Sequence, residues 1–346
     1  MANSSTANNR HLHSPLPRHF TKVLVISVIL LGVCVVASLA LGSRFVRWHE
    51  LIDGLFRPDI DSYAANVVRK RISRTVFSLF CGAALGVSGS LMQAVTRNPI
   101  ADPSILGVNT GAALFVVCGM AFLNISTADQ YIWLALAGST VTAVFVFGIG
   151  SMGRGGATPL KLVLAGAATT AALSSLVTAI IIPRSYVMDQ FRFWQVGSVG
   201  AGSWDAIATF IPFLAVGLLI GFVVGPALNA LALGDDVATG LGVRTGTLRL
   251  VAALAAVLLC GAATALAGPI GFVGLLATHL IRLTLGPDLR VIIPMSAIAG
   301  AVILTISDVI GRLAGSPGEL EVGVVTAFVG APLLILLATR AKVRSI

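Results

Sequence analysis

Charged residues are scarce in this sequence. Asp, Glu, Lys and Arg together make up 11% of its 346 residues, whereas hydrophobic residues make up 56%. Soluble domains typically carry about 25% charged residues, so this composition excludes a soluble enzyme and a disordered chain. It favours a polytopic membrane protein that lies almost entirely within the bilayer.

Motifs for nucleotide and metal binding are missing as well. The chain has no GxxxxGK[ST] loop that would hold ATP and no HExxH zinc motif. Its four cysteines lie in apolar runs without CxxC spacing, and we expect them to pack as small hydrophobic side chains. We therefore expect no catalytic residue, no metal and no cofactor bound by this chain itself.

The positive charge is spread thinly along the chain. The 23 lysines and arginines, which give a net charge of +9, occur in ones and twos between apolar runs. Nucleic-acid binding needs basic residues gathered on one face, so nucleic acid is not an expected partner. Scattered basic residues are typical of anchors at the two surfaces of a lipid bilayer.

Ten apolar runs are candidates for membrane-spanning helices. Backbone polar groups cannot stay unpaired in hydrocarbon, so an apolar run of about 20 residues must be helical. The run at 248–286 is too long for one span, and Gly268-Pro269 divides it because proline interrupts the helical hydrogen bonds. The sequence thus predicts an all-α polytopic protein with spans at 23–43, 70–96, 104–123, 132–150, 160–182, 205–227, 248–267, 271–286, 291–311 and 321–338.

The two ends of the chain are predicted to lie on one side of the membrane. We expect a disordered cytoplasmic tail at 1–22, a single transmembrane domain at 23–340 and a cytoplasmic tail at 341–346. Lys and Arg favour this orientation by 13 inside to 10 outside. Seven of the ten outside charges crowd into residues 44–74, and such an external basic cluster needs a function of its own.

Small residues show how the spans pack. Glycine pairs four residues apart, such as Gly82/Gly86, let helix backbones approach closely. The stretch GAALGVSG at 82–89 resembles GAATALAG at 261–268, and these two spans run in opposite directions in the predicted topology. This resemblance favours two inverted halves of five helices each.

Two other functions have weak support. Gly86-Val87-Ser88-Gly89 fits the GxSG pattern of intramembrane serine proteases, with His279 as the base. An ion-coupled secondary transporter would need acidic groups inside the spans, and Asp308 is the clearest of these. Arg312 lies one turn after Asp308, so an ion pair explains this aspartate better than a proton relay does.

Two polar segments stand out between the spans. Residues 225–249 are amphipathic, rich in glycine and longer than the usual helix–helix connection of about 2–8 residues. They predict one or two short surface helices with Asp235, Asp236 and Arg244 facing water. Residues 96–103, TRNPIADP, contain two prolines and an asparagine and predict a rigid bend.

Several long motifs together resemble the permease subunit of bacterial ABC importers for iron-siderophores, haem and vitamin B12, the FecCD-like type II importers. The resemblance covers residues 20–340. The motifs that carry it are RISRT at 71–75, TRNPIADPSILGVNTGAAL at 96–114, LALGDDVATGLGVRTG at 231–246, GPIGFVGLLATHLIRLTLGPDLR at 268–290 and GELEVGVVTAFVGAPLLILL at 318–337.

The resemblance implies an import machine in the bacterial inner membrane. Such permeases work in pairs, identical or homologous, with two cytoplasmic ATPase subunits that bind ATP and Mg and an external substrate-binding protein. The commonest cargo is an iron-siderophore, and haem and cobalamin stay open. Hydrolysis in a partner subunit would account for the missing nucleotide motif.

The resemblance also implies roles for individual residues. Arg71, Arg74 and Arg312 match external arginines that pair with carboxylates on the binding protein. Asn98, Pro99 and Ile100 match the inner gate. The segment 225–249 matches coupling helices that contact the ATPase, with Leu233, Gly234, Asp235, Asp236, Ala238, Leu241, Gly242, Val243 and Arg244 at their centre.

One span carries a polar stripe. Thr170, Ser174 and Thr178 recur at four-residue spacing, and the family uses this helix to line the passage. Hydroxyls in membrane helices often bond instead to the carbonyl one turn earlier, so lining and local bonding are equally favoured. Asp189 to Gly197, with three aromatic side chains, predicts a short external interfacial helix.

Overall fold

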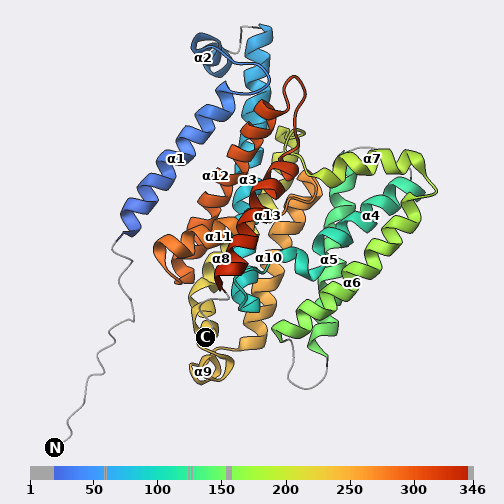
Figure 1. Ribbon diagram of the computed structural model, residues 1–346, viewed down its shortest axis with the longest axis vertical. Coiled ribbons are helices and arrows are strands. Elements are labelled where there is room, and N and C mark those ends of the chain that lie inside the picture. The colour runs from blue at the N-terminus through green and yellow to red at the C-terminus, as the bar shows by residue number, and fades with distance from the viewer. Residues whose placement is uncertain are drawn as a thin grey trace, which may run out of the picture.

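The structure is a computed structural model that describes residues 19–341, with gaps at 58, 60, 124, 126–127 and 153–157. The described residues are helical and contain no strand. Figure 1 shows the helices running up and down along one long axis. They are α1 (Phe20–Ala40), α2 (Trp48–Phe56), α3 (Tyr63–Thr96), the 3-10 helix η1 (Pro103–Leu106), α4 (Val108–Phe122), α5 (Ala128–Ser151), α6 (Pro159–Ile181), α7 (Ser185–Val196), α8 (Trp204–Ala232), α9 (Asp235–Gly240), α10 (Thr245–Ala267), α11 (Val273–Leu285), α12 (Leu289–Ala314) and α13 (Val322–Ala341).

Each of the ten predicted spans has a helix in the structure. Seven of these helices are long and apolar enough to cross a membrane: α1, α3, α5, α6, α8, α10 and α12. The other three, α4, α11 and α13, are shorter apolar helices. The 13 residues of α11 extend only about 20 Å. It is short because Gly268–Phe272, which precedes it, is not helical.

The prediction for residues 225–249 is wrong at both ends. Residues up to Ala232 continue α8, and α10 already begins at Thr245, so the connection is 233–244 and contains the single short helix α9. The polar residues around Asn229 and Arg249 stay helical because each finds a partner, Asp288 and Asp235 respectively.

Two helices lie beside the spans at the end opposite α9 (Figure 1). The predicted interfacial helix exists as α7, but it begins at Ser185, four residues before the predicted start at Asp189. No prediction covers α2, whose side chains Trp48 and Phe56 are exposed. Aromatic residues favour the headgroup region of a bilayer, so α2 and α7 mark one membrane surface.

Direct backbone contact holds the central helices together. A Cβ added to Gly82 would overlap the carbonyl group of Gly300 in α12, and one added to Gly86 would overlap that of Ser296. Gly89 lies in the same way against Gly274 of α11. The predicted role of the Gly82/Gly86 pair in close packing is therefore confirmed. These contacts make α3 the centre of a core with α8, α10, α11 and α12 around it.

The two halves of the chain meet in this core. Helix α3 descends in Figure 1 and α10 ascends beside it, as two inverted five-helix halves require. Helix α1 begins in the lower half and α13 ends there, on the side of α9. The predicted tails at 1–22 and 341–346 lie mostly outside the described residues, which begin at residue 19 and end at residue 341, and residues 20–22 belong to α1.

We expect a side chain at Gly86 to destabilise the protein. Overpacking a tight core costs about 1–3 kcal/mol, so Gly86→Ala should lower the unfolding midpoint by several degrees in detergent. Gly32 in α1 has no atom near its missing Cβ, and Gly32→Ala serves as the matched control. Equal midpoints for Gly86→Ala and Gly32→Ala would show that the α3–α12 contact tolerates a methyl group.

Candidate functional site

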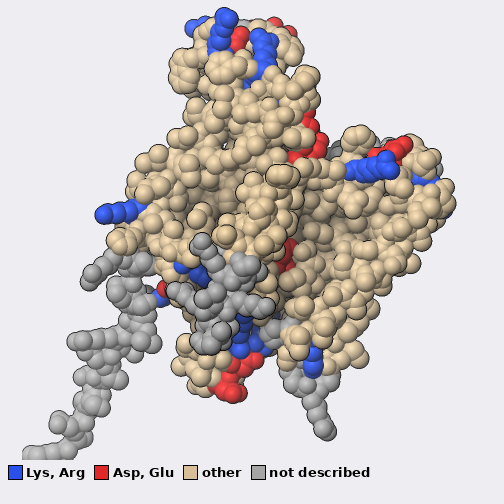
Figure 2. Space-filling model, viewed as in Figure 1, with Lys and Arg blue, Asp and Glu red and all other residues tan. Residues whose placement is uncertain are grey.

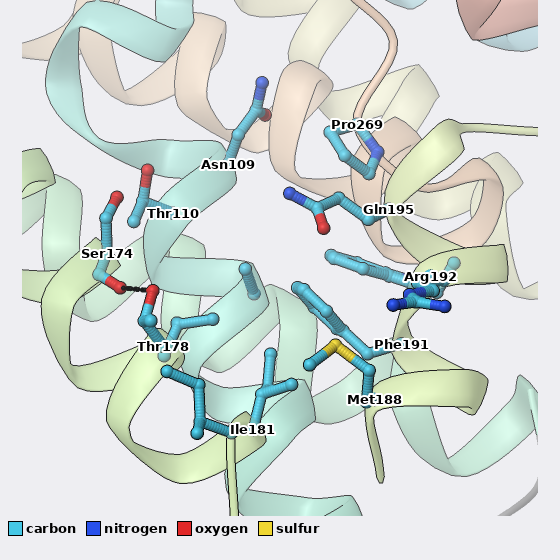
Figure 3. A pocket seen from close by; sticks show the side chains of 14 residues that line it. Asn109, Thr110, Ser174, Thr178, Ile181, Met188, Phe191, Arg192, Gln195 and Pro269 are labelled. Carbon is cyan, nitrogen blue, oxygen red and sulfur yellow. Dashed lines mark hydrogen bonds between the residues drawn. The ribbon is translucent and has the colours of Figure 1, made fainter. Parts of the chain in front are cut away.

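A cavity of about 550 Å³ lies between α4, α6 and α7. Figure 3 shows side chains from these helices facing one another across it, with Pro269 from the segment before α11 at one edge. Gly197 ends α7 with a positive φ of 77° and lies against the Pro269 carbonyl. Glycine permits both the turn and this close approach, and the turn holds α7 over the cavity.

The cavity wall is mostly apolar, with polar groups set among the apolar side chains. The polar residues that line it are Asn109, Thr110, Ser174, Thr178 and Gln195, and Arg192 is the one charged residue among those that line it. Phe191 and Trp194 stack at 5.8 Å between ring centroids on the α7 side. Such a wall offers hydrogen bonds and flat apolar surface to a large ligand.

Helix α6 shows both features expected of its polar stripe, residues that line a cavity and a local hydrogen bond. Ser174 and Thr178 line the cavity, but Thr170 does not. The Thr178 hydroxyl also donates to the Ser174 carbonyl at 2.9 Å (Figure 3), so the local hydrogen bond is present as well. The assignment of this stripe to a transport path stays a prediction.

Sequence reasoning missed several residues of the wall. Asn109 accepts a hydrogen bond from Thr264 of α10 at 3.0 Å, which fixes its side chain at the cavity. The indole N–H of Trp194 is buried without a hydrogen-bond partner. The only sequence signal for these residues was the aromatic content of residues 189–197, because the fold alone brings α4 and α7 together.

The three predicted docking arginines belong to one buried network. Arg74 donates to Asp308 at 2.7 Å and to Glu319 at 2.6 Å. Arg312 pairs with Asp308 at 3.0 Å, as predicted from their spacing, and also donates to the Ser38 carbonyl. The network joins α1, α3, α12 and the loop after α12, so it holds the upper end of the core together.

Burial limits what these arginines offer to a partner. Arg312 is 2% exposed and Arg71 is 7% exposed, and within the part of the chain that the structure describes the Arg71 guanidinium donates to carbonyl groups of residues 39, 40 and 44. The side chain of Arg74 keeps 13% exposure, and that of its partner Glu319 keeps 39%. Only this outer edge of the network reaches the surface, and docking by all three arginines stays a prediction.

The basic cluster at residues 44–74 is largely balanced by acids. Arg44 pairs with Glu50 and Arg57 with Asp53, and Asp59 and Asp61 lie in the same stretch. Figure 2 shows most charged side chains of this face at its upper and lower ends, with a broad uncharged band between them. The band is the surface expected to meet lipid.

The lower end of the molecule presents α9 and an exposed apolar row. Leu233, Val237 and Leu241, spaced four residues apart, are 66%, 49% and 64% exposed. Only Ala238 of α9 is buried, at 0% exposure. Asp236 and Arg244 are exposed as predicted. The predicted coupling residues thus form a surface that combines apolar and charged groups outside the spans.

Asp235 differs from its neighbour Asp236, because two ion pairs hold its carboxylate. Its Oδ1 accepts hydrogen bonds from Arg97 at the end of α3 and from Arg249 of α10, the latter at 2.8 Å. Burial acts to raise the pKa of this carboxyl, but the hydrogen bonds and charges of the two guanidiniums outweigh it and bring the pKa below its ordinary value. The carboxylate is therefore ionised at neutral pH.

The predicted bend follows α3 directly. Arg97 is the C-cap of α3 and has a left-handed backbone, with φ 50°. The Asn98 amide donates to the Gln93 carbonyl, and the Asn98 side chain accepts from the Ile100 amide at 3.1 Å. Pro99 and Ile100 are exposed. The rigid bend is confirmed, while its role as an inner gate stays a prediction.

The protease alternative lacks its catalytic geometry. Ser88 is fully buried, and its hydroxyl donates to the Ala256 carbonyl of α10 at 2.5 Å. Nε2 of His279 has no hydrogen-bond partner, so the two side chains form no nucleophile–base pair. Asp308, occupied by two arginines, is likewise a structural group. The described residues contain no cluster of metal-ligating side chains.

Comparison with known proteins gives one consistent result. Residues 30–340 match the FecCD transport family. The chain is 39% identical to the ferric enterobactin transport system permease protein FepD of Escherichia coli, over 90% of this chain and 93% of the relative. It is 37% identical to the Fe(3+)-citrate import system permease protein YfmD of Bacillus subtilis, over 93% of this chain and 95% of the relative.

Solved structures agree with the sequence relatives. A metal-chelate type ABC transporter in an inward-facing conformation superposes with a TM-score of 0.80 at 25% identity and covers 92% of this chain and 99% of that chain. PsaBC from Streptococcus pneumoniae, with a TM-score of 0.56 and 15% identity, shares the fold. The helices, the cavity and these likenesses lead to one conclusion: this chain is a permease of the FecCD transport family.

Proposed function

We propose that this chain is the membrane-spanning half of an ATP-driven importer that carries an iron-siderophore into the cytoplasm of a bacterium. The cavity between α4, α6 and α7 is the observation that carries the proposal, because it offers a ligand-sized space with several polar groups in its wall inside a membrane fold. The relatives named for ferric enterobactin and ferric citrate support iron chelates as cargo. Both termini would lie in the cytoplasm, on the side of α9.

The chemistry of the wall favours a chelate over a free metal ion. Transition metals bind to imidazole, thiolate or carboxylate groups, and none of the residues that line the cavity carries one. Amide and hydroxyl groups, together with the free indole N–H of Trp194, suit the oxygen-rich shell of a siderophore. Haem and cobalamin, which present apolar faces, would use the stacked Phe191 and Trp194 instead.

Two kinds of partner would complete the machine inside the membrane and below it. A second permease, identical or homologous, would close the open side of the cavity, where Ser174 and Thr178 are exposed in the single chain. Two ATPase subunits would bind the row of Leu233, Val237 and Leu241. Exposed apolar side chains outside the bilayer are costly unless a partner covers them, and this supports the assignment.

An external binding protein would dock at the opposite end. Arg74 and Glu319 form the exposed edge of the buried arginine network, and we place the docking contact there. Arg71 and Arg312 would position Arg74 from below. A carboxylate on the binding protein would compete with Glu319 for the outward-facing Nη1 of Arg74.

Transport by the complete complex tests the function directly. In proteoliposomes, uptake of a radiolabelled ferric siderophore should require the binding protein and hydrolysable ATP, and it should not change when ion gradients are collapsed. Labelled haem and cobalamin, assayed in parallel, define the cargo. Uptake that follows a proton or sodium gradient without ATP would establish a secondary transporter in place of this proposal.

The cavity assignment predicts different effects at two adjacent serines. Ser174→Leu should reduce uptake about tenfold or more, because a large apolar side chain replaces a hydroxyl in the wall and fills the passage. Ser175 does not line the cavity, so Ser175→Leu should leave uptake near that of the native protein. Equal uptake by the two variants, at equal expression and assembly, would remove Ser174 from the path.

The docking contact predicts opposite effects for its two partners. Glu319→Gln should tighten the binding protein on the permease complex because Arg74 is released, and Arg74→Met should weaken it. Each change should be at most about fivefold, since exposed pairs contribute only about 0–1 kcal/mol. Affinities in nanodiscs across a salt series measure this, with unfolding midpoints as a check on folding. Two folded variants with native affinity and salt slope would leave the arginines a purely structural role.

A further inference from the structure

Glycines flank the short helix α9 on both sides. Gly234 and Gly242 flank it with positive φ values of 115° and 83°, a backbone region that glycine enters without strain. Neither glycine has another group within 4 Å of its missing Cβ. Of the six residues of α9 only Ala238 is buried, so few side-chain contacts hold this helix in its orientation.

One of those contacts joins α9 to the bend after α3. Asp235 is the first residue of α9, and Arg97 and Arg249 both bond to its Oδ1. The side chain of Arg249 is 7% exposed and fixed within the helical core, whereas that of Arg97 is 33% exposed and sits at a chain turn. Asp235 thus connects Arg249, which is fixed in the core, with Arg97, where the backbone changes direction.

The backbone at Arg97 makes this turn sensitive to its side chain. A left-handed backbone is unfavourable for a residue that has a Cβ, so the arginine stands where glycine would be easier to accommodate. The next residues, Asn98 to Ala101, form a tight turn with hydrogen bonds back to Gln93 and within itself. A displacement of the Arg97 side chain would therefore move the turn at residues 98–101 as a unit.

We propose that the Asp235–Arg97 ion pair is the link that transmits movement of α9 to the inner bend at 97–101. This inference rests on the proposed function, in which α9 contacts the ATPase. Asp235 is a positioning residue that faces into the permease, and the neighbouring Asp236 faces outward to the partner. Two adjacent carboxylates on one short helix thus serve transmission and attachment separately.

The two aspartates predict different defects. With Asp235→Asn, the complex should assemble and hydrolyse ATP at the native rate, while uptake per ATP hydrolysed falls at least tenfold. Asp235→Glu keeps the carboxylate and should restore much of the coupling. With Asp236→Asn, the ATPase should bind more weakly, and uptake per ATP hydrolysed should stay native. Asp205→Asn, an exposed aspartate in the first turn of α8 at the opposite end, is the control for loss of one charge.

A double-mutant cycle separates the two arginines that bind Asp235. If Arg97 is the coupled partner, Asp235→Asn combined with Arg97→Gln should lower coupling no further than either change alone. Combination with Arg249→Gln should instead add a loss of thermal stability, because that residue is buried at the start of α10. Additive coupling losses for Asp235 and Arg97 would overturn the link.

Movement of the bend gives a readout that a purely structural role would leave unchanged. Ile100 is 47% exposed, and Ile100→Cys reports the bend through its labelling rate with a soluble maleimide, measured against the parent protein. The rate should change between ATP-bound and nucleotide-free complexes, and Asp235→Asn should abolish this change although hydrolysis continues. A native rate change in Asp235→Asn refutes the link, whereas native transport without ATP refutes the proposed function itself.

Discussion

Hydrocarbon offers no water to polar groups, and this constraint governs most of the structure. Each polar side chain inside the spans needs a partner from the chain itself. Ser88 therefore bonds to a carbonyl of α10, and Asn109 to Thr264. Arg312, at 2% exposure, is tolerated because Asp308 and the backbone of α1 surround its guanidinium.

Close helix contact through glycine is the second consequence of that environment. Lipid tails are as apolar as leucine, so burying leucine between helices gains little in a membrane. Backbone contacts at Gly82, Gly86 and Gly89 gain dispersion energy instead. They fix α3 in the middle of the core, and α3 in turn carries the buried arginines at one end and the bend at the other. Both of these ends are thus built on one long helix.

The sequence predicts the spans well and the contacts between them poorly. Ten apolar runs correspond to ten helices because each run is constrained locally by the bilayer. The short helix α2 escaped prediction because nine residues with a mixed pattern carry too little periodic signal. The boundaries of α8 and α10 were misplaced because polar residues near Asn229 and Arg249 find partners distant in sequence. Local polarity alone suggested a surface segment there.

The candidate site likewise has contacts that the sequence predicts and contacts that it does not. The i, i+4 spacing of Asp308 and Arg312 gives their ion pair directly from the sequence, and the motif around Asp235 predicts the exposed polar segment that contains α9. No local pattern predicts the ion pair of Arg74 with Glu319, because 245 residues separate the two. The same holds for Arg97 and Asp235, which are 138 residues apart. The same holds for Asn109 and Trp194, which reach one cavity from different helices.

The open side of the cavity has a consequence for how cargo preference evolves. In the proposed pair of permeases, a wall contributed by one chain would face a wall contributed by the other, and the ligand would be held by two half-sites. When both chains come from one gene, every substitution in α6 alters both half-sites together, and gradual change is difficult. Gene duplication would release that constraint, because each copy can then adapt its own half-site to one face of an asymmetric chelate.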